Sequence, residues 1–473
     1  MRFLVALAVL LAGCGGSGTD GSAPGSATAE GADSLVDPGA ETHLNANPAV
    51  YDSVPLPEGL VWETNDSDPI FASPDAKRGG TFTDYWSGFP LTLRLIGPDA
   101  NSGESVSQRR SNTPALVEFH PNTLRPTPYM ATHWAYGDDG RTVYYRLDPR
   151  ARWSDGEPVV ADDYLFNVEM NVSEHVLYPF GQNYFSEVVV DVRKHDDHTI
   201  SVTGAAALPR AELMLEYTVE PAPRHFYVVD ENWVQNYDWR VAPTAGPYDM
   251  SAVANGRYIE FTRKDDWWGD ALKYQQHRYN PDVLRFEIIR DQNVAYEYFL
   301  NGELDRYVFD TLPARWHERA QGPDFDNGYI HRIEFYNNLP RDQRALWLNT
   351  DDPMLADRNV RLGLAHSINM DRVLERIFRG DYERMQIQHE EFFFGYTDTG
   401  IKAREFDVDR AGEYFDAAGW SDYGRDGIRM KDGRRLSFSI SYGTDDHTPW
   451  LVVVREEARK AGVELNLRLL DMA

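Results

Sequence analysis

The pattern of hydrophobic and polar positions predicts strands and helices that alternate along most of the chain. Residues 141–147 alternate with period two after a Gly-Asp-Asp-Gly turn, which is typical of a half-buried strand. Residues 360–378 and 451–461 carry apolar side chains at helical spacing and are followed by glycines that end helices. Further strands are predicted at residues 79–83, 198–203, 258–262, 283–289 and 463–470. This interleaving indicates an α/β or α+β fold in more than one domain.

The first fourteen residues have the pattern of an export signal. Arg2 gives a short positive region, residues 3–10 are apolar, and residues 11–14 read Leu-Ala-Gly-Cys. The apolar run is about half the length that spans a bilayer, so residues 1–13 are predicted to be a signal peptide. Cys14 is the sole cysteine, and its setting resembles the lipobox of bacterial lipoproteins. We therefore expect a lipid on Cys14 that anchors the protein to a membrane, in the periplasm or at the cell surface; the alternative is an ordinary signal peptide.

Residues 14–70 are predicted to be a flexible linker. Residues 15–49 are rich in Gly, Ser, Ala, Asp and Thr, and such a segment cannot bury enough apolar surface to offset the entropy of ordering. Residues 16–21 match the pattern GxGxxG. No predicted strand precedes this stretch and no helix follows it, so a dinucleotide site is excluded there.

Composition narrows the classes of protein to consider. The 473 residues are 42% hydrophobic and 26% charged, which is an ordinary globular balance. The net charge of −28 would repel phosphate backbones, so a nucleic acid is not an expected partner. Aromatic residues reach 13%, which suits a large core or an aromatic-lined binding cleft. The single cysteine excludes an internal disulfide framework and a cysteine-rich metal site.

The sequence contains no enzyme active-site motif in the structural context that its chemistry requires. The sequence lacks HExxH and GxxxxGK[ST], and His389-Glu390-Glu391 has no second histidine at the spacing of a zinc site. Residues 445–447 (Asp-Asp-His) fit a turn that begins a helix better than a metal corner. We therefore expect a protein without catalytic activity, cofactor or metal. The alternative is an extracytoplasmic hydrolase that uses a carboxylate pair or a bound metal.

Several short motifs follow one another in order along the chain. RPTPYMATHW at residues 125–134 leads into DDGRTVYYRL at 138–147 and ARWSDGEPVVADD at 151–163. The later motifs are TAGPY at 244–248, DDWW at 265–268, LWLNT at 346–350 and DRNVRLGLA at 357–365. Together they resemble the signature of the bacterial extracellular solute-binding proteins of family 5, the oligopeptide and dipeptide type. The resemblance extends from about residue 79 to the last residue.

The resemblance implies an α/β, two-lobed clamp of the periplasmic-binding-protein type II, cluster C-like, with an extra inserted domain. It places domain I at residues 71–118 and 204–320, domain II at 119–203 and domain III at 321–473. Such proteins close their lobes on a ligand and deliver it to an ABC permease, and we expect a monomer. Family members continue well past the strand that ends at Leu470, so the last domain is expected to be incomplete and less stable than the rest.

The resemblance also implies an oligopeptide ligand, with a metal chelate, haem or an oligosaccharide as alternatives. Aromatic rings offer broad apolar contact, while amide and backbone groups bond a peptide as an added strand would. Seven positions match segments that approach the ligand in the family. They are Glu104, Ser105, Tyr307 (which follows Arg306), Trp347, Asn349, Tyr442 and His447.

The WSDG motif is expected to serve structure rather than ligand binding. The resemblance implies that Trp153 packs in domain II and that Asp155-Gly156 forms a turn. Asp162 is expected to cap the helix that follows.

Overall fold

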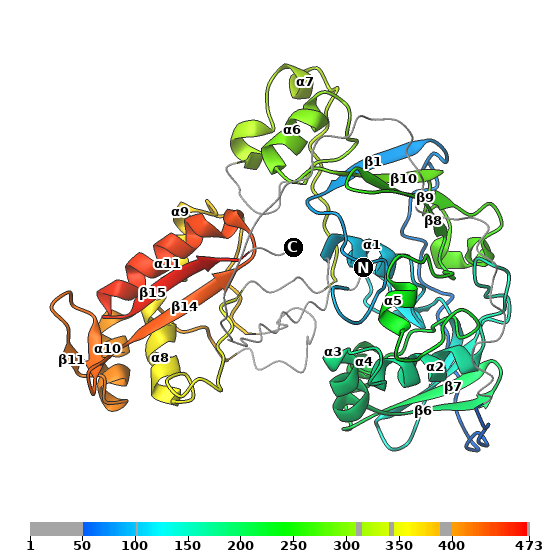
Figure 1. Ribbon diagram of the computed structural model, residues 1–473, viewed down its shortest axis with the longest axis horizontal. Helices are drawn as coiled ribbons and strands as arrows, with labels where there is room; N and C mark the ends of the chain where they lie inside the picture. The colour runs from blue at the N-terminus through cyan, green and yellow to red at the C-terminus, as the bar shows by residue number, and fades with distance from the viewer. Residues whose placement is uncertain (1–50, 101–102, 309–314, 340–344, 388–399, 471–473) are drawn as a thin grey trace. The chain divides into compact units, whose positions relative to one another are not determined.

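The computed structural model describes residues 51–100, 103–308, 315–339, 345–387 and 400–470. The chain divides into two compact units, Met1–Tyr307 and Val308–Ala473, each with its own hydrophobic core (Figure 1). Within these described ranges, no helix is long and apolar enough to cross a membrane.

The larger core of the first unit lies on a four-stranded antiparallel sheet with the strand order β4-β5-β7-β6. Its strands are β4 (Ala131–Tyr136), β5 (Thr142–Leu147), β6 (Val189–Asp196) and β7 (Thr199–Gly204). Period-two alternation sends Val143 and Tyr145 of β5 into the core, as predicted, together with Trp134 of β4. Helix α2 (Ala161–Val172) packs beside β6.

A second sheet of the first unit joins early and late parts of the chain. Its order is β1-β10-β9-β8, with β1 (Thr81–Trp86), β8 (Tyr248–Ala254), β9 (Tyr258–Arg263) and β10 (Val283–Ile288). Strand β1 pairs in parallel with β10, from Thr81 opposite Val283 onward, and the other pairs are antiparallel. The aromatic side chains of Trp86, Phe261 and Phe286 form its core.

Short elements complete the first unit. The helices are α1 (Gly103–Ser111), α3 (Pro179–Asn183), α4 (Arg210–Glu216), α5 (Trp233–Tyr237) and α6 (Gln292–Leu300), and β2 (Val117–Phe119) pairs with β3 (Pro126–Pro128). Helical turns of three to five residues lie between several of the elements.

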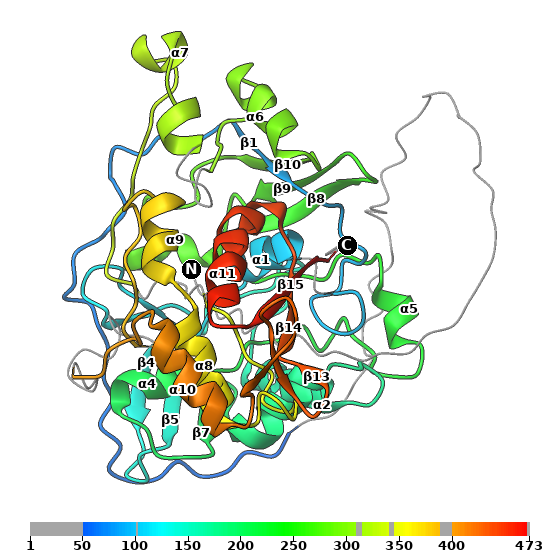
Figure 2. The ribbon, with the colours of Figure 1, turned by 90° about the vertical axis from the view of Figure 1, so that its left-hand side faces the viewer.

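The second unit packs helices against a parallel pair of strands, β14 (Ser437–Tyr442) and β15 (Glu464–Leu469). Figures 1 and 2 both show α11 (Thr448–Lys460) alongside this pair, as the predicted helix and strand required. The other elements are α7 (Pro323–Asp326), α8 (Arg358–Ser367), α9 (Met370–Arg376), α10 (Val408–Ala417), β11 (Asp422–Tyr423), β12 (Arg429–Lys431) and β13 (Arg434–Arg435). Phe415, Leu436 and Val454 are fully buried in its core.

The prediction of one helix over residues 360–378 is wrong in one respect. The structure has two helices, α8 and α9, which are separated at Ile368 and Asn369. The Asn369 side chain accepts a hydrogen bond from the backbone N–H of Arg372 at 3.0 Å and so caps α9. Apolar spacing continues across the break, which is why the pattern alone did not reveal it.

The prediction of a flexible linker over residues 14–70 is wrong for residues 51–70, which pack on the first unit, while residues 14–50 lie outside the described part of the chain. The Val54 N–H donates to the Lys194 carbonyl of β6 at 2.9 Å, while Glu63 and Trp134 of β4 exchange backbone hydrogen bonds of 2.8 and 3.0 Å. Since β6 and β4 are the two edges of their sheet, this strap (residues 51–70) pairs with both edges. The sequence did not reveal this packing, because backbone groups make these bonds.

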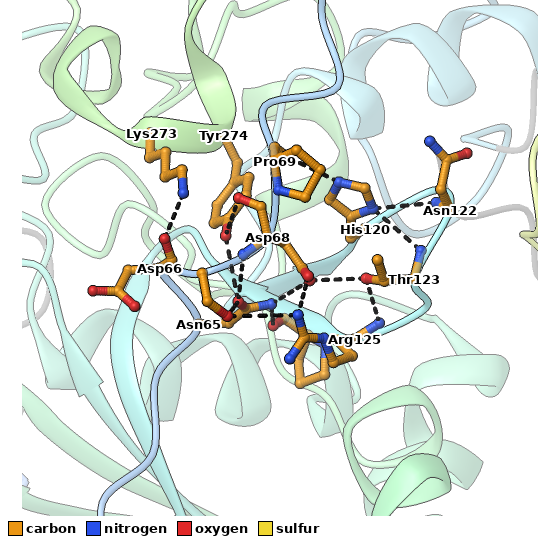
Figure 3. Close-up of polar contacts among 12 residues, drawn as sticks. Asn65, Asp66, Asp68, Pro69, His120, Asn122, Thr123, Arg125, Lys273 and Tyr274 are labelled. Atoms are coloured by element: carbon orange, nitrogen blue, oxygen red, sulfur yellow. Dashed lines mark hydrogen bonds and ion pairs between the residues drawn. The ribbon is translucent and has the colours of Figure 1, made fainter.

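A buried polar cluster fastens the end of the strap (Figure 3). The Asp68 carboxylate accepts hydrogen bonds from Asn65 at 2.7 Å and Thr123 at 2.8 Å, and it forms an ion pair with Arg125. The Tyr274 hydroxyl lies 3.3 Å from the Asp68 carbonyl. Figure 3 shows the side chains converging on Asp68 from the strap, the turn before β3 and the Tyr274 segment. Asp68 therefore joins three segments that are distant in sequence.

Asp68→Asn is expected to lower the free energy of unfolding by about 1–3 kcal/mol, because the buried cluster loses its negative charge and one of the two oxygens that accept its hydrogen bonds. Burial alone would raise the pKa of Asp68, but hydrogen bonds from Arg125, Asn65 and Thr123 outweigh burial and lower it to about 2. The contribution is therefore present above the ordinary carboxyl pKa and is lost as the pH falls toward 2. Urea unfolding at several pH values would measure it, with Asp66→Asn as the exposed control. Equal stability of both variants would contradict the assignment.

Candidate ligand-binding surfaces

An aromatic platform in the first unit contains Tyr307. Its ring stacks on Tyr85 of β1, with centroids 6.1 Å apart and planes 14° apart, and meets the edge of Tyr296 of α6 at 5.2 Å. The Tyr307 hydroxyl donates to the Gln292 carbonyl at 3.1 Å. Tyr307 is half-buried, so it offers part of its surface while its other contacts hold it in place.

The segment before Tyr307 is fixed to the side of β1 that faces away from β10. Asp305 accepts a hydrogen bond from the Thr83 N–H through its carboxylate at 2.7 Å, and its own N–H donates to the Thr83 carbonyl at 2.8 Å. Arg306 forms an ion pair with the buried carboxylate of Asp84. The Arg306 guanidinium therefore positions this segment and holds the platform against β1.

Ser105 lies in the first turns of α1 and its side chain is fully buried. Among the described residues its hydroxyl has no hydrogen-bond partner. The predicted ligand contact at Ser105 stays a prediction. The side chain of Glu104 lies outside the described part of the chain.

In the second unit Tyr442 is the last residue of β14 and His447 directly precedes α11. The Tyr442 hydroxyl lies 3.0 Å from the Thr448 hydroxyl, which donates to Asp445 at 3.0 Å, and the His447 ring lies 5.7 Å from the Trp450 ring. In open α/β sheets, ligands bind beside the carboxyl ends of parallel strands. Neither Thr448 nor Trp450 was identified from the sequence. Pro449, in the first turn of α11, was the available signal for the start of this helix.

Trp347 and Asn349 lie outside the helices and strands of the second unit. Trp347 is 66% exposed, and the Asn349 side chain accepts a hydrogen bond from the Asp351 N–H at 3.1 Å within its own turn. An exposed tryptophan is free to cover a ligand.

The WSDG segment is placed as a structural element. Trp153 is buried in the larger core, and its indole N–H donates to the Asp163 carboxylate at 3.3 Å. Asp163, rather than the predicted Asp162, accepts the hydrogen bond from the Val160 N–H at 3.0 Å that caps α2. Burial raises the pKa of Asp163 to about 6. Asp162 instead pairs with Lys194. The prediction that Asp162 caps the helix is therefore wrong, and the adjacent aspartate, Asp163, is the cap.

Two surface grooves lie elsewhere on the described part of the chain. One, of about 460 Å³, lies between the strap near Val61 and the turn after Tyr136, with Arg210 at its side. The other, of about 390 Å³, runs between α11 and β15 and is lined by Arg455 and Leu465. No predicted ligand residue lines either groove. No group of three or more His, Cys, Asp or Glu side chains in the described ranges could hold a metal ion.

Comparison with known proteins places the sequence among solute-binding proteins. Residues 125–473 match the family model "Bacterial extracellular solute-binding proteins, family 5 Middle". The chain is 24% identical over 443 residues to the uncharacterized protein YejA of Escherichia coli, covering 85% of this chain and 70% of YejA. It is 27% identical over 326 residues to a putative binding protein of Brucella melitensis, BMEII0691, covering 67% of this chain. The matched part spans about half, 52%, of the Brucella protein.

Solved structures share the fold. The oligopeptide-binding protein AppA of Bacillus subtilis, in complex with a nonapeptide, matches with a TM-score of 0.63 and 18% identity over 84% of this chain and 76% of AppA. NikZ of Campylobacter jejuni, in complex with Ni(L-His), matches with a TM-score of 0.61 and 19% identity over 83% of this chain and 74% of NikZ. The predicted α/β binding-protein fold is confirmed.

Proposed function

The chain belongs to the bacterial extracellular solute-binding proteins of family 5, and from this membership we propose that it captures oligopeptides by closure of its lobes and delivers them to an ABC permease. The observation that carries the proposal is the family match over residues 125–473, which covers about three quarters of the chain. The nonapeptide in the similar AppA structure supports a peptide as the ligand. We propose that the protein itself has no catalytic activity.

The proposed ligand contacts combine aromatic surface with hydrogen-bonding groups. Tyr307 and the Tyr442–His447 corner each join an aromatic ring to a nearby hydroxyl or ring nitrogen. Rings tolerate many apolar side chains, while polar groups bond the peptide backbone, which is shared by all sequences. The proposed ligand residues are Glu104, Ser105, Tyr307, Trp347, Asn349, Tyr442 and His447.

Binding is tested by titrating the purified chain with a mixed oligopeptide library and following tryptophan fluorescence. A saturable change, with peptides recovered intact by mass spectrometry, is the expected result. Tyr442→Ala is expected to weaken binding roughly tenfold, equivalent to about 1.4 kcal/mol. Tyr329→Ala, a largely exposed tyrosine of the same unit, is the matched control. Cleaved peptide would favour a hydrolase, and no saturable change with any peptide would contradict the proposal.

A metal chelate is the second candidate ligand, because the similar NikZ structure holds Ni(L-His). His447 is the residue of the proposed set that suits a chelated metal. Native mass spectrometry of the purified chain distinguishes the two: a peptide adduct supports the first proposal, and a nickel–histidine adduct supports the second.

We further propose that the protein is held outside the cytoplasm by a lipid on Cys14. The supporting observation is the Leu-Ala-Gly-Cys sequence after an apolar segment, at the only cysteine. Cys14→Ser is expected to abolish palmitate labelling and to move the protein from the membrane to the soluble fraction. Ser17→Ala, three residues away, is the control and should label normally. Labelling that persists in Cys14→Ser would contradict the proposal.

A further inference from the structure

A turn in the first unit makes side-chain contacts with two segments that are distant in sequence, at His225 and at Thr244. Residues 153–157 follow β5, and the backbone bonds Trp153 N–H to the Glu157 carbonyl at 2.8 Å and Gly156 N–H to the Trp153 carbonyl at 3.0 Å close the turn. On one side the Asp155 carboxylate lies 2.6 Å from Nε2 of His225. On the other side the Ser154 hydroxyl accepts a hydrogen bond from the Thr244 N–H at 3.2 Å. Thr244 leads directly into β8 of the second sheet.

The His225–Asp155 pair is largely shielded from water. The two side chains are 20% and 22% exposed, and the Trp153 ring lies 6.3 Å from the His225 ring. A charge pair in such a setting is screened less by salt than a surface pair. Ionisation of His225 therefore has a larger effect on stability here than it would on an exposed surface.

Several other charged groups lie near the His225–Asp155 pair. Asp163 and Glu157 both add attraction to a protonated His225. Arg224 lies 4.0 Å from Asp163 and 3.7 Å from Asp162, so its charge is directed to α2. On the Thr244 side, Lys264 donates to the Thr244 carbonyl at 2.6 Å and pairs with Asp249 at 3.5 Å. Negative groups outnumber positive ones beside His225, which favours its cation.

The pKa values of the turn agree with this geometry. Burial alone would lower the pKa of His225, but the hydrogen bond and charge of Asp155 outweigh burial and raise it. Burial would raise the pKa of Asp155, and His225 lowers it below its ordinary value. A histidine with a raised pKa stabilises the fold fully below its unfolded value of 6.5, and the contribution is lost as the pH rises through the folded value. Asp163, whose pKa burial raises to about 6, changes stability in the same direction at lower pH.

We propose that His225 and Asp155 form a proton-dependent latch, which holds the turn at residues 153–157 in place more firmly in mildly acidic than in alkaline surroundings. The latch acts on the turn at residues 153–157, and through Ser154 and Thr244 on the start of β8. It is independent of the proposed ligand, because none of the proposed ligand residues takes part in it.

The test compares wild type with His225→Gln, whose side-chain amide still donates to Asp155 but does not titrate. The melting temperature and the hydrogen exchange of the Thr244 amide, corrected for its intrinsic rate, are measured at about pH 5.5 and about pH 8. Wild type is expected to lose roughly 2–4 °C more than the variant on going to the higher pH, and its Thr244 protection should fall with it. The remaining pH dependence of the variant reports Asp163 and other groups.

His317→Gln is the matched control. His317 makes the same kind of pair with Asp381 at 2.8 Å, but in the second unit and with side chains 44% and 36% exposed. This variant should follow wild type at both pH values. Identical pH dependence of wild type and His225→Gln would overturn the latch. Where His225→Gln does not fold, the NMR titration of the wild-type ring decides: a pKa above 6.5 supports the latch, and a lower one overturns it.

Discussion

Trp153→Ala is expected to lower the free energy of unfolding by about 3–5 kcal/mol, because it removes a large ring from a well-packed core. Trp153 is buried among the side chains of the larger core, including Tyr145 and Val159. Its indole N–H also bonds Asp163, so truncation leaves a buried carboxylate with one donor fewer. Urea unfolding followed by circular dichroism would measure the loss.

Trp347→Ala is the control for this prediction. Trp347 is 66% exposed, so its removal should leave the free energy of unfolding nearly unchanged. A Trp153→Ala protein that melts like wild type yet binds no peptide would show that Trp153 contacts ligand, and the structural role would be wrong. Reduced stability with peptide affinity retained in the folded fraction is the expected combination.

Lys194→Met is expected to destabilise the first unit by a similar amount, about 3–5 kcal/mol, because it leaves a buried charge without its partner. The Lys194 ammonium lies 2.9 Å from the Asp162 carboxylate and 2.8 Å from that of Asp197. The Lys194 and Asp162 side chains are only 7% and 6% exposed, whereas Asp197 is 72% exposed. The loss of stability arises from the buried Asp162 carboxylate, because its remaining partner, Arg224, is 3.7 Å away and pairs with it less closely.

Two companion variants separate the buried pair from the exposed one. Asp197→Asn should change the free energy of unfolding by about 1 kcal/mol or less, because water already solvates that carboxylate. Lys194→Met combined with Asp162→Leu should recover most of the lost stability, since no unpaired charge remains. Denaturant midpoints of wild type, Lys194→Met, Asp162→Leu and the double variant form a double-mutant cycle. Additive losses in the double variant would show that Lys194 and Asp162 do not interact.

Periodicity predicted the elements whose burial follows from their own side chains. Strand β5 alternates inward and outward residues, and α11 keeps one apolar face, so each appears in the sequence as a local pattern. The split between α8 and α9 was missed because a cap on Asn369, rather than a change of apolar spacing, makes the break. The ordered motifs from residue 125 onward likewise led to the family, which the comparison confirmed.

The candidate site was predictable only as separate positions. Tyr442 and His447 are near one another in sequence, but their contacts with Thr448 and Trp450 become visible only in the structure. The stacking of Tyr307 on Tyr85 joins residues from opposite ends of the first unit's chain, and no local pattern contains that information. The domain boundaries and the ligand residues stay predictions that binding experiments will test.

The sequence by itself determined the alternation of strands and helices and the family, because each depends on residues within a short window or on their order. Only the tertiary structure decided that β1 pairs with β10, that residues 51–70 bond both edges of a sheet, and that Asp162 faces Lys194. It also decided that His225 meets Asp155. The physical reason is that packing of the cores decides which distant segments meet and so which backbone hydrogen bonds and ion pairs form between them. The sequence shows the type of a polar residue, but it does not show whether that side chain contacts water or a buried charge.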